Sequence, residues 1–254
     1  MNQNNGTSVE APEAAALTER SAVAAVICAA GSSARMQGFK KEYSLLPDDS
    51  GLTVLGAAVS AFAALPAVKT VVISVPAETG DIEARKALPP GLFSDDGPRI
   101  LFVPGGKTRR ASVHRALSLL SACRLRYVLI HDGARPWISP AFIESLIEAV
   151  QKYRAVIPLL PLTETPKEAD VSFEAEPVFI KRHLRRAVVG TAQTPQAFAF
   201  PEILAAHEKA AEYERNGTVE YTDDAEVWGA FIGPVAAIPG LPGNRKITFP
   251  EDLL

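Results

Sequence analysis

The feature that most constrains the fold is a repeated alternation of short apolar runs with segments of helical periodicity. The apolar runs are rich in valine, isoleucine and leucine, which predicts strands at 23–30, 69–75, 99–103, 126–131 and 154–160. Between them, the spacing of apolar residues predicts helices at 52–65, 81–88, 109–121 and 139–153. Strand, helix, strand, helix in this order is typical of right-handed βαβ units. The sequence therefore predicts an α/β fold with a mostly parallel sheet and helices on both faces.

The alternation breaks in the stretch 160–190. This stretch carries prolines, charges and only short apolar pieces, which is typical of a β-rich insertion or protruding arm. After it, apolar spacing predicts two further helices at 201–217 and 222–231, and a late strand at 233–240. We therefore expect a β-arm that interrupts the α/β domain near its carboxyl-terminal third.

Length and composition are those of an ordinary globular domain. Of the 254 residues 47% are hydrophobic and 22% charged, which allows a sizeable core. The first residues are polar and lack the basic start and apolar core of a signal peptide. We therefore expect a disordered tail over 1–21 and a single domain over 22–254. The apolar run 22–30 is too short to cross a membrane, so the expected compartment is the cytoplasm.

Charge and cysteine content argue against several classes of function. The formal net charge is −3, whereas a general nucleic-acid-binding protein is usually strongly basic. The cysteines Cys28 and Cys123 and the four histidines show no spacing typical of a zinc site or a disulfide framework. Neither nucleic acid nor a membrane is therefore an expected partner. A small anionic substrate stays open, because local fields can oppose the net charge.

Positive charge is concentrated in four segments, 31–41, 105–115, 181–186 and 243–248. They hold 13 of the 26 lysines and arginines and no aspartate or glutamate. Three of them lie at predicted strand ends, and an open parallel sheet binds ligands outside the carboxyl ends of its strands. These segments favour a site for a polyanion such as a nucleoside triphosphate. The alternative is that they are solvated basic loops.

The loop AAGSSAR after the first predicted strand has the composition of an anion-binding turn. Its small residues let the backbone approach a ligand, and Gly31 can adopt a positive φ. Arg35 can bridge phosphate oxygens bidentately, while Lys41 is a compact point charge. The loop matches neither the dinucleotide-binding nor the Walker A motif. A tight turn without a ligand would look similar, so this loop alone leaves both interpretations open.

Two further loops carry related chemistry. In HDGARP, Asp132 follows a predicted strand, where carboxylates bind metal ions or ligand hydroxyls; the alternative is a structural aspartate paired with Arg135. His131 is expected to be packed at the strand end rather than to act as a base. In GGKTRRASV, Gly106 lets a base or ribose lie against the backbone, and Ser112 can hydrogen-bond a base edge. The alternative is a serine that only supports the start of a helix.

Seven motifs together carry a resemblance to a known family. They are, in order, AAGSSARM with KKEY, GGKTRRASV, HDGARP, PLTETPK, RR-x7-TPQAF, YTDDA and GNRKITFPEDL. From about residue 23 to 254 the chain resembles the 2-C-methyl-D-erythritol 4-phosphate cytidylyltransferases. The resemblance implies a Rossmann-like nucleotidyltransferase sheet with a protruding β-arm that forms a homodimer. It also implies the family's reaction, in which CTP is the co-substrate, Mg²⁺ the cofactor, and methylerythritol phosphate the acceptor in non-mevalonate isoprenoid synthesis.

The resemblance also implies roles for individual residues. The cytidine contacts would be Ala29, Ala30, Gly31, Gly106 and Ser112. The catalytic cations would be Arg35 and Lys41 on the triphosphate, with Arg186 and Lys246 on the acceptor phosphate. The other residues around the acceptor would be Asp132, Arg135, Thr165 and Thr194. Because arm residues of the family reach the neighbouring subunit's site, Thr165 is predicted to act in trans, with Arg135 and Arg186 as further candidates. No metal ligands are assigned, and Asp132 is the preferred carboxylate.

The chain departs from the family pattern at several positions. Ser33 stands where glycine is frequent, Lys40 where proline is usual, Glu42 where glutamine is common and Gly133 where alanine is usual. Two other functions stay open. One is a cytidylyltransferase for another polyol phosphate, such as ribitol 5-phosphate. The other is a non-catalytic nucleotide-binding module on the same fold.

Overall fold

The structure is a computed structural model of the chain. The residues that it describes are 23–31, 36, 39–77, 80–171, 177–215, 217 and 221–253. The expected tail over 1–21 lies outside these residues, as do Ser33 and Arg35.

An eight-stranded mixed sheet forms the centre of the molecule, in the order β10-β5-β9-β4-β1-β2-β3 with β8 paired to β5. The strands that run in one direction are β1 (Val23–Cys28), β2 (Val68–Val75), β3 (Arg99–Pro104), β4 (Tyr127–Asp132), β5 (Ala155–Pro161) and β10 (Ala236–Pro239). Antiparallel to them are β8 (Gly190–Ala192) and β9 (Gln196–Ala199). The predicted mostly parallel α/β sheet is confirmed. The strand β9 was not predicted, because four residues are too few to show a period.

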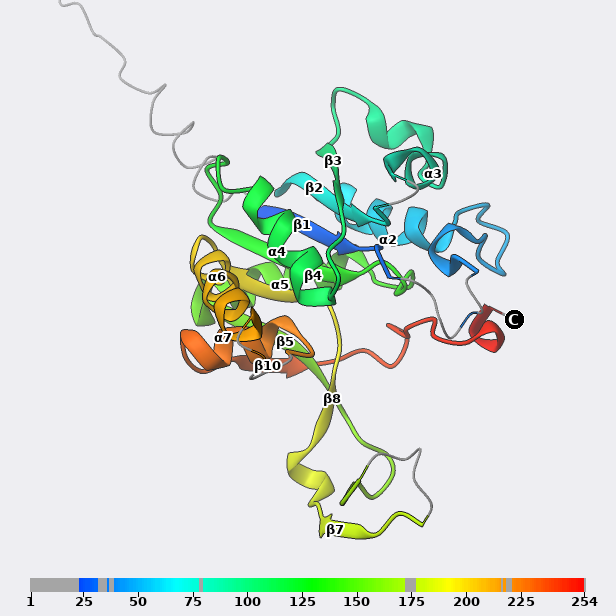
Figure 1. Cartoon of the computed structure of the whole chain (residues 1–254). Helices are drawn as coiled ribbons and strands as arrows, with labels where there is room; N and C mark the ends of the chain where they lie inside the picture. The colour runs from blue at the N-terminus through cyan, green and yellow to red at the C-terminus, as the bar shows by residue number, and fades with distance from the viewer. Residues whose placement is uncertain are drawn as a thin grey trace, which may run out of the picture.

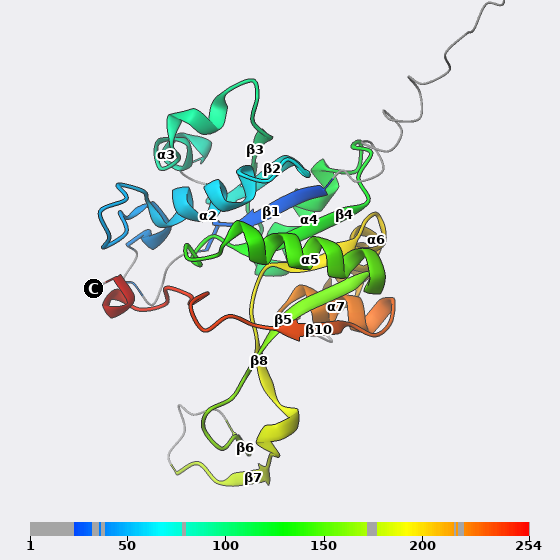
Figure 2. The ribbon, with the colours of Figure 1, turned by 180° about the vertical axis from the view of Figure 1, so that it is seen from behind.

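Helices cover both faces of the sheet, which Figures 1 and 2 show from opposite sides. The helices are α2 (Val54–Ala63), α3 (Gly80–Lys86), α4 (Arg109–Leu119), α5 (Pro140–Tyr153), α6 (Glu202–Arg215) and α7 (Asp224–Phe231). Short 3-10 turns lie at η2 (Lys41–Tyr43), η3 (Pro90–Phe93), η4 (Arg186–Val188) and η5 (Pro250–Leu253). Thr108 begins α4 as its N-cap, because its hydroxyl accepts a hydrogen bond from the amide of Ala111 at 3.1 Å. None of the helices in the described part of the chain has the length and apolar character needed to cross a membrane.

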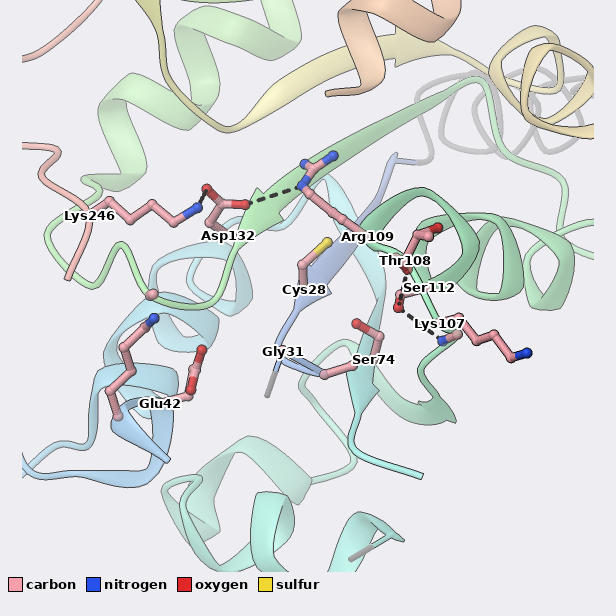
Figure 3. A pocket seen from close by; sticks show the side chains of 14 residues that line it. Cys28, Gly31, Glu42, Ser74, Lys107, Thr108, Arg109, Ser112, Asp132 and Lys246 are labelled. Carbon is pink, nitrogen blue, oxygen red and sulfur yellow. Dashed lines mark hydrogen bonds and ion pairs between the residues drawn. The ribbon is translucent and has the colours of Figure 1, made fainter. Parts of the chain in front are cut away.

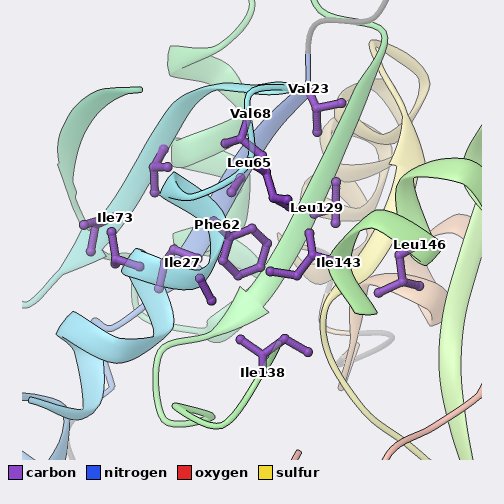
Figure 4. Packing of buried hydrophobic residues seen from close by; sticks show 14 of the residues in the cluster. Val23, Ile27, Phe62, Leu65, Val68, Ile73, Leu129, Ile138, Ile143 and Leu146 are labelled. Carbon is purple, nitrogen blue, oxygen red and sulfur yellow. The ribbon is translucent and has the colours of Figure 1, made fainter. Parts of the chain in front are cut away.

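The alternation of side chains along β1 accounts for two hydrophobic cores. Val23 and Ile27 face α2 and α5 and belong to one cluster with Phe62, whose ring lies beside Ile27 and Leu129 (Figure 4). Ala24 and Val26 face the opposite layer, which contains α4 and α6. All of these side chains are fully buried, as expected for a continuous apolar run in a parallel strand. Because both faces of β1 are buried, the end of this strand is held rigidly, and the loop that follows it starts from a fixed point.

The 160–190 segment leaves the main sheet through β5 and returns through β8. Within it, β6 (Lys167–Ala169) and β7 (Ile180–His183) pair antiparallel in a separate two-stranded sheet. Figures 1 and 2 show this small sheet hanging away from the rest of the molecule. All four residues of β7 are exposed. The pairing of β6 with β7 agrees with a β-rich stretch after residue 160, while the predicted arm and its part in a dimer stay predictions.

Candidate active site

A cavity of about 520 Å³ lies at the carboxyl ends of β1, β2 and β4. Its lining comes from these strand ends, the loops after β1, β3 and β4, the turn η2, the start of α4 and the chain near Lys246 (Figure 3). The lining residues are Cys28, Ala30, Gly31, Lys41, Glu42, Ser74, Gly106, Lys107, Thr108, Arg109, Ser112, Asp132, Ala134 and Lys246. The cavity therefore lies where open parallel sheets bind their ligands.

The loop after β1 forms one wall of the cavity. Ala29 is fully buried, and its amide donates a hydrogen bond to the carbonyl of Ser74 on β2 at 3.0 Å. Ala30 and Gly31 follow and line the cavity. The ammonium of Lys40 donates to the carbonyl of Gly31 at 2.7 Å. This contact brings the start of the loop and its end together.

Lys41 differs from its neighbour Lys40. Lys41 lines the cavity and is only 9% exposed, and its ammonium forms no hydrogen bond or ion pair with another described residue. Lys40 instead lies 3.3 Å from the carboxylate of Glu42. An ammonium in the wall of the cavity without a carboxylate of its own is placed to bind an incoming anion. The second predicted cation of this loop, Arg35, lies outside the described residues.

The glycine loop after β3 forms the opposite wall. A Cβ atom at Gly105 would lie 2.2 Å from the Cβ of Ala30, so glycine is required where the two walls touch. The hydroxyl of Ser112 accepts a hydrogen bond from the amide of Gly106 and donates one to the carbonyl of Thr108, both at 3.0 Å. Its proton is thus used inside the loop. The structure therefore favours the alternative interpretation of Ser112 as a support of the loop, with one acceptor position left for a ligand.

Asp132 is the centre of a group of cations at the end of β4. Its carboxylate lies 2.9 Å from the ammonium of Lys246, 3.5 Å from Arg135 Nε and 3.6 Å from Arg109 Nε. Burial alone would raise the pKa of Asp132. Lys246, Arg109 and Arg135 outweigh burial and hold this pKa well below its ordinary value. The group therefore keeps an ionised carboxylate beside three cations at neutral pH, and the carboxylate balances part of their charge.

Arg109 is a cavity residue that the sequence analysis did not single out. Its guanidinium lies 2.8 Å from the carboxylate of Asp224, which is fully buried at the start of α7. The other oxygen of Asp224 lies 3.2 Å from Nε2 of the buried His207. The segment 105–115 contains several cations, and nothing in their spacing shows which one turns into the cavity. The basic composition was the only available signal.

Thr194 lies behind Asp132 rather than in the lining of the cavity. Its hydroxyl accepts a hydrogen bond from the amide of Asp132 at 3.0 Å and contacts Nδ1 of His131 at 3.1 Å. Nε2 of His131 lies 3.1 Å from the carbonyl of Arg135, so Nε2 carries the ring proton and Nδ1 accepts from Thr194. Burial lowers the pKa of His131 to about 4, so the ring is neutral at neutral pH. This supports the expectation that His131 is a packed residue.

Two predicted acceptor residues lie outside this cavity. Thr165 and Arg186 belong to the 160–190 segment, and both are exposed. The guanidinium of Arg186 donates to the carbonyl of Thr163 at 2.6 Å. One chain therefore does not bring either residue to its own cavity, in contrast to Lys41, Asp132 and Lys246. Their predicted action in trans on a neighbouring subunit stays a prediction.

The family model of the 2-C-methyl-D-erythritol 4-phosphate cytidylyltransferases matches residues 23–254. The chain belongs to this family. The resemblance expected from the seven motifs is thus confirmed.

Relatives of the cytidylyltransferase family match most of the chain. The bifunctional enzyme IspD/IspF of Bradyrhizobium sp. (strain ORS 278) is 38% identical over 241 residues, which cover 94% of this chain and 56% of that protein. The crystal structure of the cytidylyltransferase from Thermus thermophilus is 32% identical, with a TM-score of 0.63, over 91% of this chain and 95% of that one. The 4-diphosphocytidyl-2C-methyl-D-erythritol synthase of Anaerococcus prevotii DSM 20548 is 26% identical, with a TM-score of 0.73, over 92% and 95%. The chain spans about half the length of the curated relatives that it matches.

The cavity offers few protein ligands for a metal ion. No group of three or more histidine, cysteine, aspartate or glutamate side chains in the described ranges is arranged to hold one. Asp132 is the carboxylate at the centre of the cations. Mg²⁺ at substrate phosphates usually keeps several waters and takes only one or two carboxylates from the protein. The residues present therefore fit a magnesium ion that arrives with a triphosphate, and do not fit a closed protein cage.

Proposed function

We propose that this chain transfers a cytidylyl group from CTP to 2-C-methyl-D-erythritol 4-phosphate, in the non-mevalonate synthesis of isoprenoid precursors. The products are the CDP-alcohol and pyrophosphate. The observation that carries this proposal is the cavity, in which Lys41 and Lys246 lie in one lining with the glycine loop of Gly106. A space with backbone-lined walls and two lysines suits a nucleoside triphosphate together with a second phosphate.

The nucleotide half of the cavity would bind CTP through backbone and cations. The residues against the cytidine are Ala29, Ala30, Gly31, Gly106 and Ser112, of which Ala29 supports the wall from inside. Lys41 and Arg35 bind the triphosphate. The position of Lys41 supports this role, because the residue lines the cavity and its ammonium forms no hydrogen bond or ion pair with another described residue. An anion there would supply its missing partner.

The acceptor half of the cavity would bind methylerythritol phosphate around Asp132. Lys246 and Arg186 bind the acceptor phosphate. The residues around the rest of the acceptor are Asp132, Arg135, Thr165 and Thr194. Asp132 and Thr194 act mainly by position, because the carboxylate holds Lys246 at 2.9 Å and the threonine hydroxyl holds the amide of Asp132 at 3.0 Å.

The chemistry needs positioning more than proton transfer. An oxygen of the acceptor phosphate forms the new bond to the α-phosphorus of CTP, and the bond from that phosphorus to the bridging oxygen breaks as pyrophosphate leaves. The acceptor phosphate is already an anion, so no strong base is required. The main obstacle is repulsion between two anions. Cations fixed in advance by Asp132 and by the loop of Lys41 would lower that barrier.

A divalent cation, preferably Mg²⁺, completes the proposed site. Asp132 is the protein carboxylate that would hold it, and the triphosphate would supply most other ligands. When bound, the ion supplies further positive charge against the negative charge of the phosphates. The cations Lys41 and Lys246 do the same from the protein side.

We also propose a homodimer formed through the 160–190 segment. Phe179 and Ile180 in this segment are 65% and 50% exposed, so a partner could cover apolar surface there. In such a dimer Thr165 and Arg186 would reach the neighbouring cavity. The proposed location is the cytoplasm, and the proposed organisation is a single domain over 22–254 after a tail over 1–21.

The function is tested by measuring pyrophosphate release from CTP with each of two acceptors. We expect turnover with 2-C-methyl-D-erythritol 4-phosphate that clearly exceeds turnover with ribitol 5-phosphate, and a requirement for a divalent cation. The reverse preference would identify the other polyol phosphate as the acceptor. CTP binding without pyrophosphate release from either acceptor would instead indicate a non-catalytic nucleotide-binding module.

A further inference from the structure

Lys246 stands on a part of the chain with no regular secondary structure. This part connects β10 to η5, so no strand ladder or helix fixes the backbone around Lys246. Even so, the ammonium of Lys246 lies 2.9 Å from the carboxylate of Asp132. Other contacts must hold the backbone in place, because a free loop would lose conformational entropy on forming this ion pair.

The buried side chain of Gln193 provides the first set of these contacts. Its Nε2 donates to the carbonyl of Leu241 at 2.9 Å and to that of Asn244 at 3.2 Å, and its Oε1 accepts from the amide of Leu241 at 3.0 Å. The amide of Gln193 itself donates to the carbonyl of Pro158 on β5 at 2.9 Å. A Cβ at Gly240 would lie 2.7 Å from Oε1, so the glycine lets the carboxamide lie against the chain.

The buried side chain and the backbone carbonyl of Asn244 provide the second set of contacts. Asn244 is fully buried, and its Nδ2 donates to the carbonyl of Thr194 at 2.8 Å. Its own carbonyl accepts from Arg135 Nη1 at 2.8 Å. On the other side of Lys246, the amide of Ile247 donates to the carbonyl of Ala134 at 2.9 Å. The backbone is therefore fixed on both sides of Lys246.

Both sets of contacts are connected to Asp132 through Gln193 and its neighbour Thr194. Thr194, whose carbonyl accepts from Asn244, also accepts the amide of Asp132 through its hydroxyl. The adjacent residues Gln193 and Thr194 thus hold both partners of the Lys246–Asp132 ion pair. We propose that Gln193 and Asn244 are positioning residues, which place the ammonium of Lys246 for the acceptor phosphate. This inference rests on the proposed function, since it deepens the role of the same site.

The kinetic test is a double-mutant cycle between Gln193→Leu and Lys246→Met. Gln193→Leu keeps similar bulk and removes all three hydrogen bonds to the chain near Lys246. We expect kcat/KM for the acceptor phosphate to fall about 10- to 100-fold, with KM for CTP changed less than about twofold, because small misplacements of a binding group are costly. In the Lys246→Met background the same change should cost less than about twofold, since the residue that it positions is gone. Equal losses in both backgrounds would overturn the proposal.

A second measurement does not depend on turnover. The rate at which an amine-acylating reagent modifies Lys246, followed by mass spectrometry of the digested protein, reports how firmly the ammonium is held. We expect about a tenfold faster modification in Gln193→Leu and in Asn244→Ala, because the ammonium leaves its carboxylate more often. Unchanged rates in both variants would contradict the proposal. Faster modification in a protein that cannot turn over CTP would keep the positioning role and reject the proposed function.

Thr53→Ala is the matched control for general destabilisation. The hydroxyl of Thr53 accepts from the amide of Gly56 at 2.9 Å and donates to the carbonyl of Ala87 at 2.6 Å, and Thr53 does not line the cavity. This variant should lower Tm, while kcat/KM for the acceptor and the modification rate of Lys246 stay within about twofold of the wild type. A tenfold effect of Thr53→Ala on either quantity would show that loss of stability alone produces it, and would overturn the proposal.

Discussion

Two basic segments of the chain look alike in sequence and end in different surroundings. In 105–115, Arg109 contacts the buried Asp224 at 2.8 Å, and Arg110 contacts Glu214 at 2.6 Å. In 181–186, the side chains of Lys181 and Arg182 are 61% and 68% exposed and share one carboxylate, that of Glu168. One segment is folded into the cavity of its own chain, and the other stands on the surface of an outlying two-stranded sheet.

The difference shows how one composition can serve two purposes. Cations that are paired with buried carboxylates are positioned before any ligand arrives. The free-energy cost of removing these charges from water is therefore already included in folding. Cations on the outlying sheet are solvated and carry little stabilising energy. They can contribute to a site only when another surface approaches them. The cavity is therefore organised within one chain, whereas Arg186 and Thr165 depend on assembly in the proposed dimer.

The largest expected effect comes from changing Asp224, the buried carboxylate that pairs with Arg109 of segment 105–115. Asp224→Asn leaves the guanidinium of Arg109 and the ring of His207 without their carboxylate. Because removing one partner of a buried ion pair leaves a charge poorly solvated, we expect a loss of about 3 kcal/mol in the free energy of unfolding. Denaturant titration measures it. In the control Glu168→Gln, on the exposed sheet, the unfolding midpoint should not move measurably; equal shifts in the two variants would contradict the comparison.

The same comparison explains how far the sequence could predict the site. A continuous apolar run predicts strands such as Val23–Cys28. Asp132 was singled out because it directly follows a predicted strand, and the structure makes it the last residue of β4. Arg109 could not be told from its neighbour Arg110, because both lie in the first turn of α4 and only packing decides which one meets Asp132. The roles of Asn244 and Gln193 were also invisible, since they depend on hydrogen bonds across about 50 residues of chain.

The next prediction compares two neighbouring lysines, Lys41 in the lining of the cavity and Lys40 beside it. Lys41→Ala should lower kcat about 10²- to 10³-fold, because it removes the charge that we propose to face the triphosphate. Tm should stay nearly unchanged, because Lys41 forms no ion pair with the described residues. The matched control Lys40→Ala loses contacts to Glu42 and Gly31, so it should lower Tm and reduce kcat less than about tenfold. Pyrophosphate release near the wild-type rate in Lys41→Ala would refute its assignment.

A pH dependence of stability follows from the buried neutral ring of His131. Its pKa is lowered by burial from 6.5 to about 4 in the folded chain. Between these values the unfolded chain binds a proton that the folded chain does not, so the free energy of unfolding falls as pH falls. The size of this decrease is about 3 kcal/mol between pH 7 and pH 4. Urea titrations across this range should show a clearly flatter profile in His131→Gln, and an unchanged slope would reject burial as its cause.

The smallest of these effects concerns Arg186, at the end of the exposed basic segment 181–186. Arg186→Ala should raise KM for the acceptor phosphate about 10- to 100-fold, because the charged hydrogen bond proposed between Arg186 and the phosphate is lost. Tm should not change, since Arg186 is exposed. The neighbouring exposed Arg182 provides the control, and Arg182→Ala should leave KM for the acceptor within about twofold of the wild type.

Mixing two impaired variants decides whether Arg186 acts on its own chain or on a partner. In a mixed dimer of Arg186→Ala with Lys41→Ala, action in trans gives one cavity with both cations intact. Random mixing then restores about a quarter of the wild-type activity per site, because half of the dimers are mixed and each has one intact cavity. Action in cis leaves every cavity with one cation missing, so the mixture would be no more active than its components. That second result would show that Arg186, in η4, reaches the cavity of its own chain. The two basic segments would then differ only in how exposed their cations are.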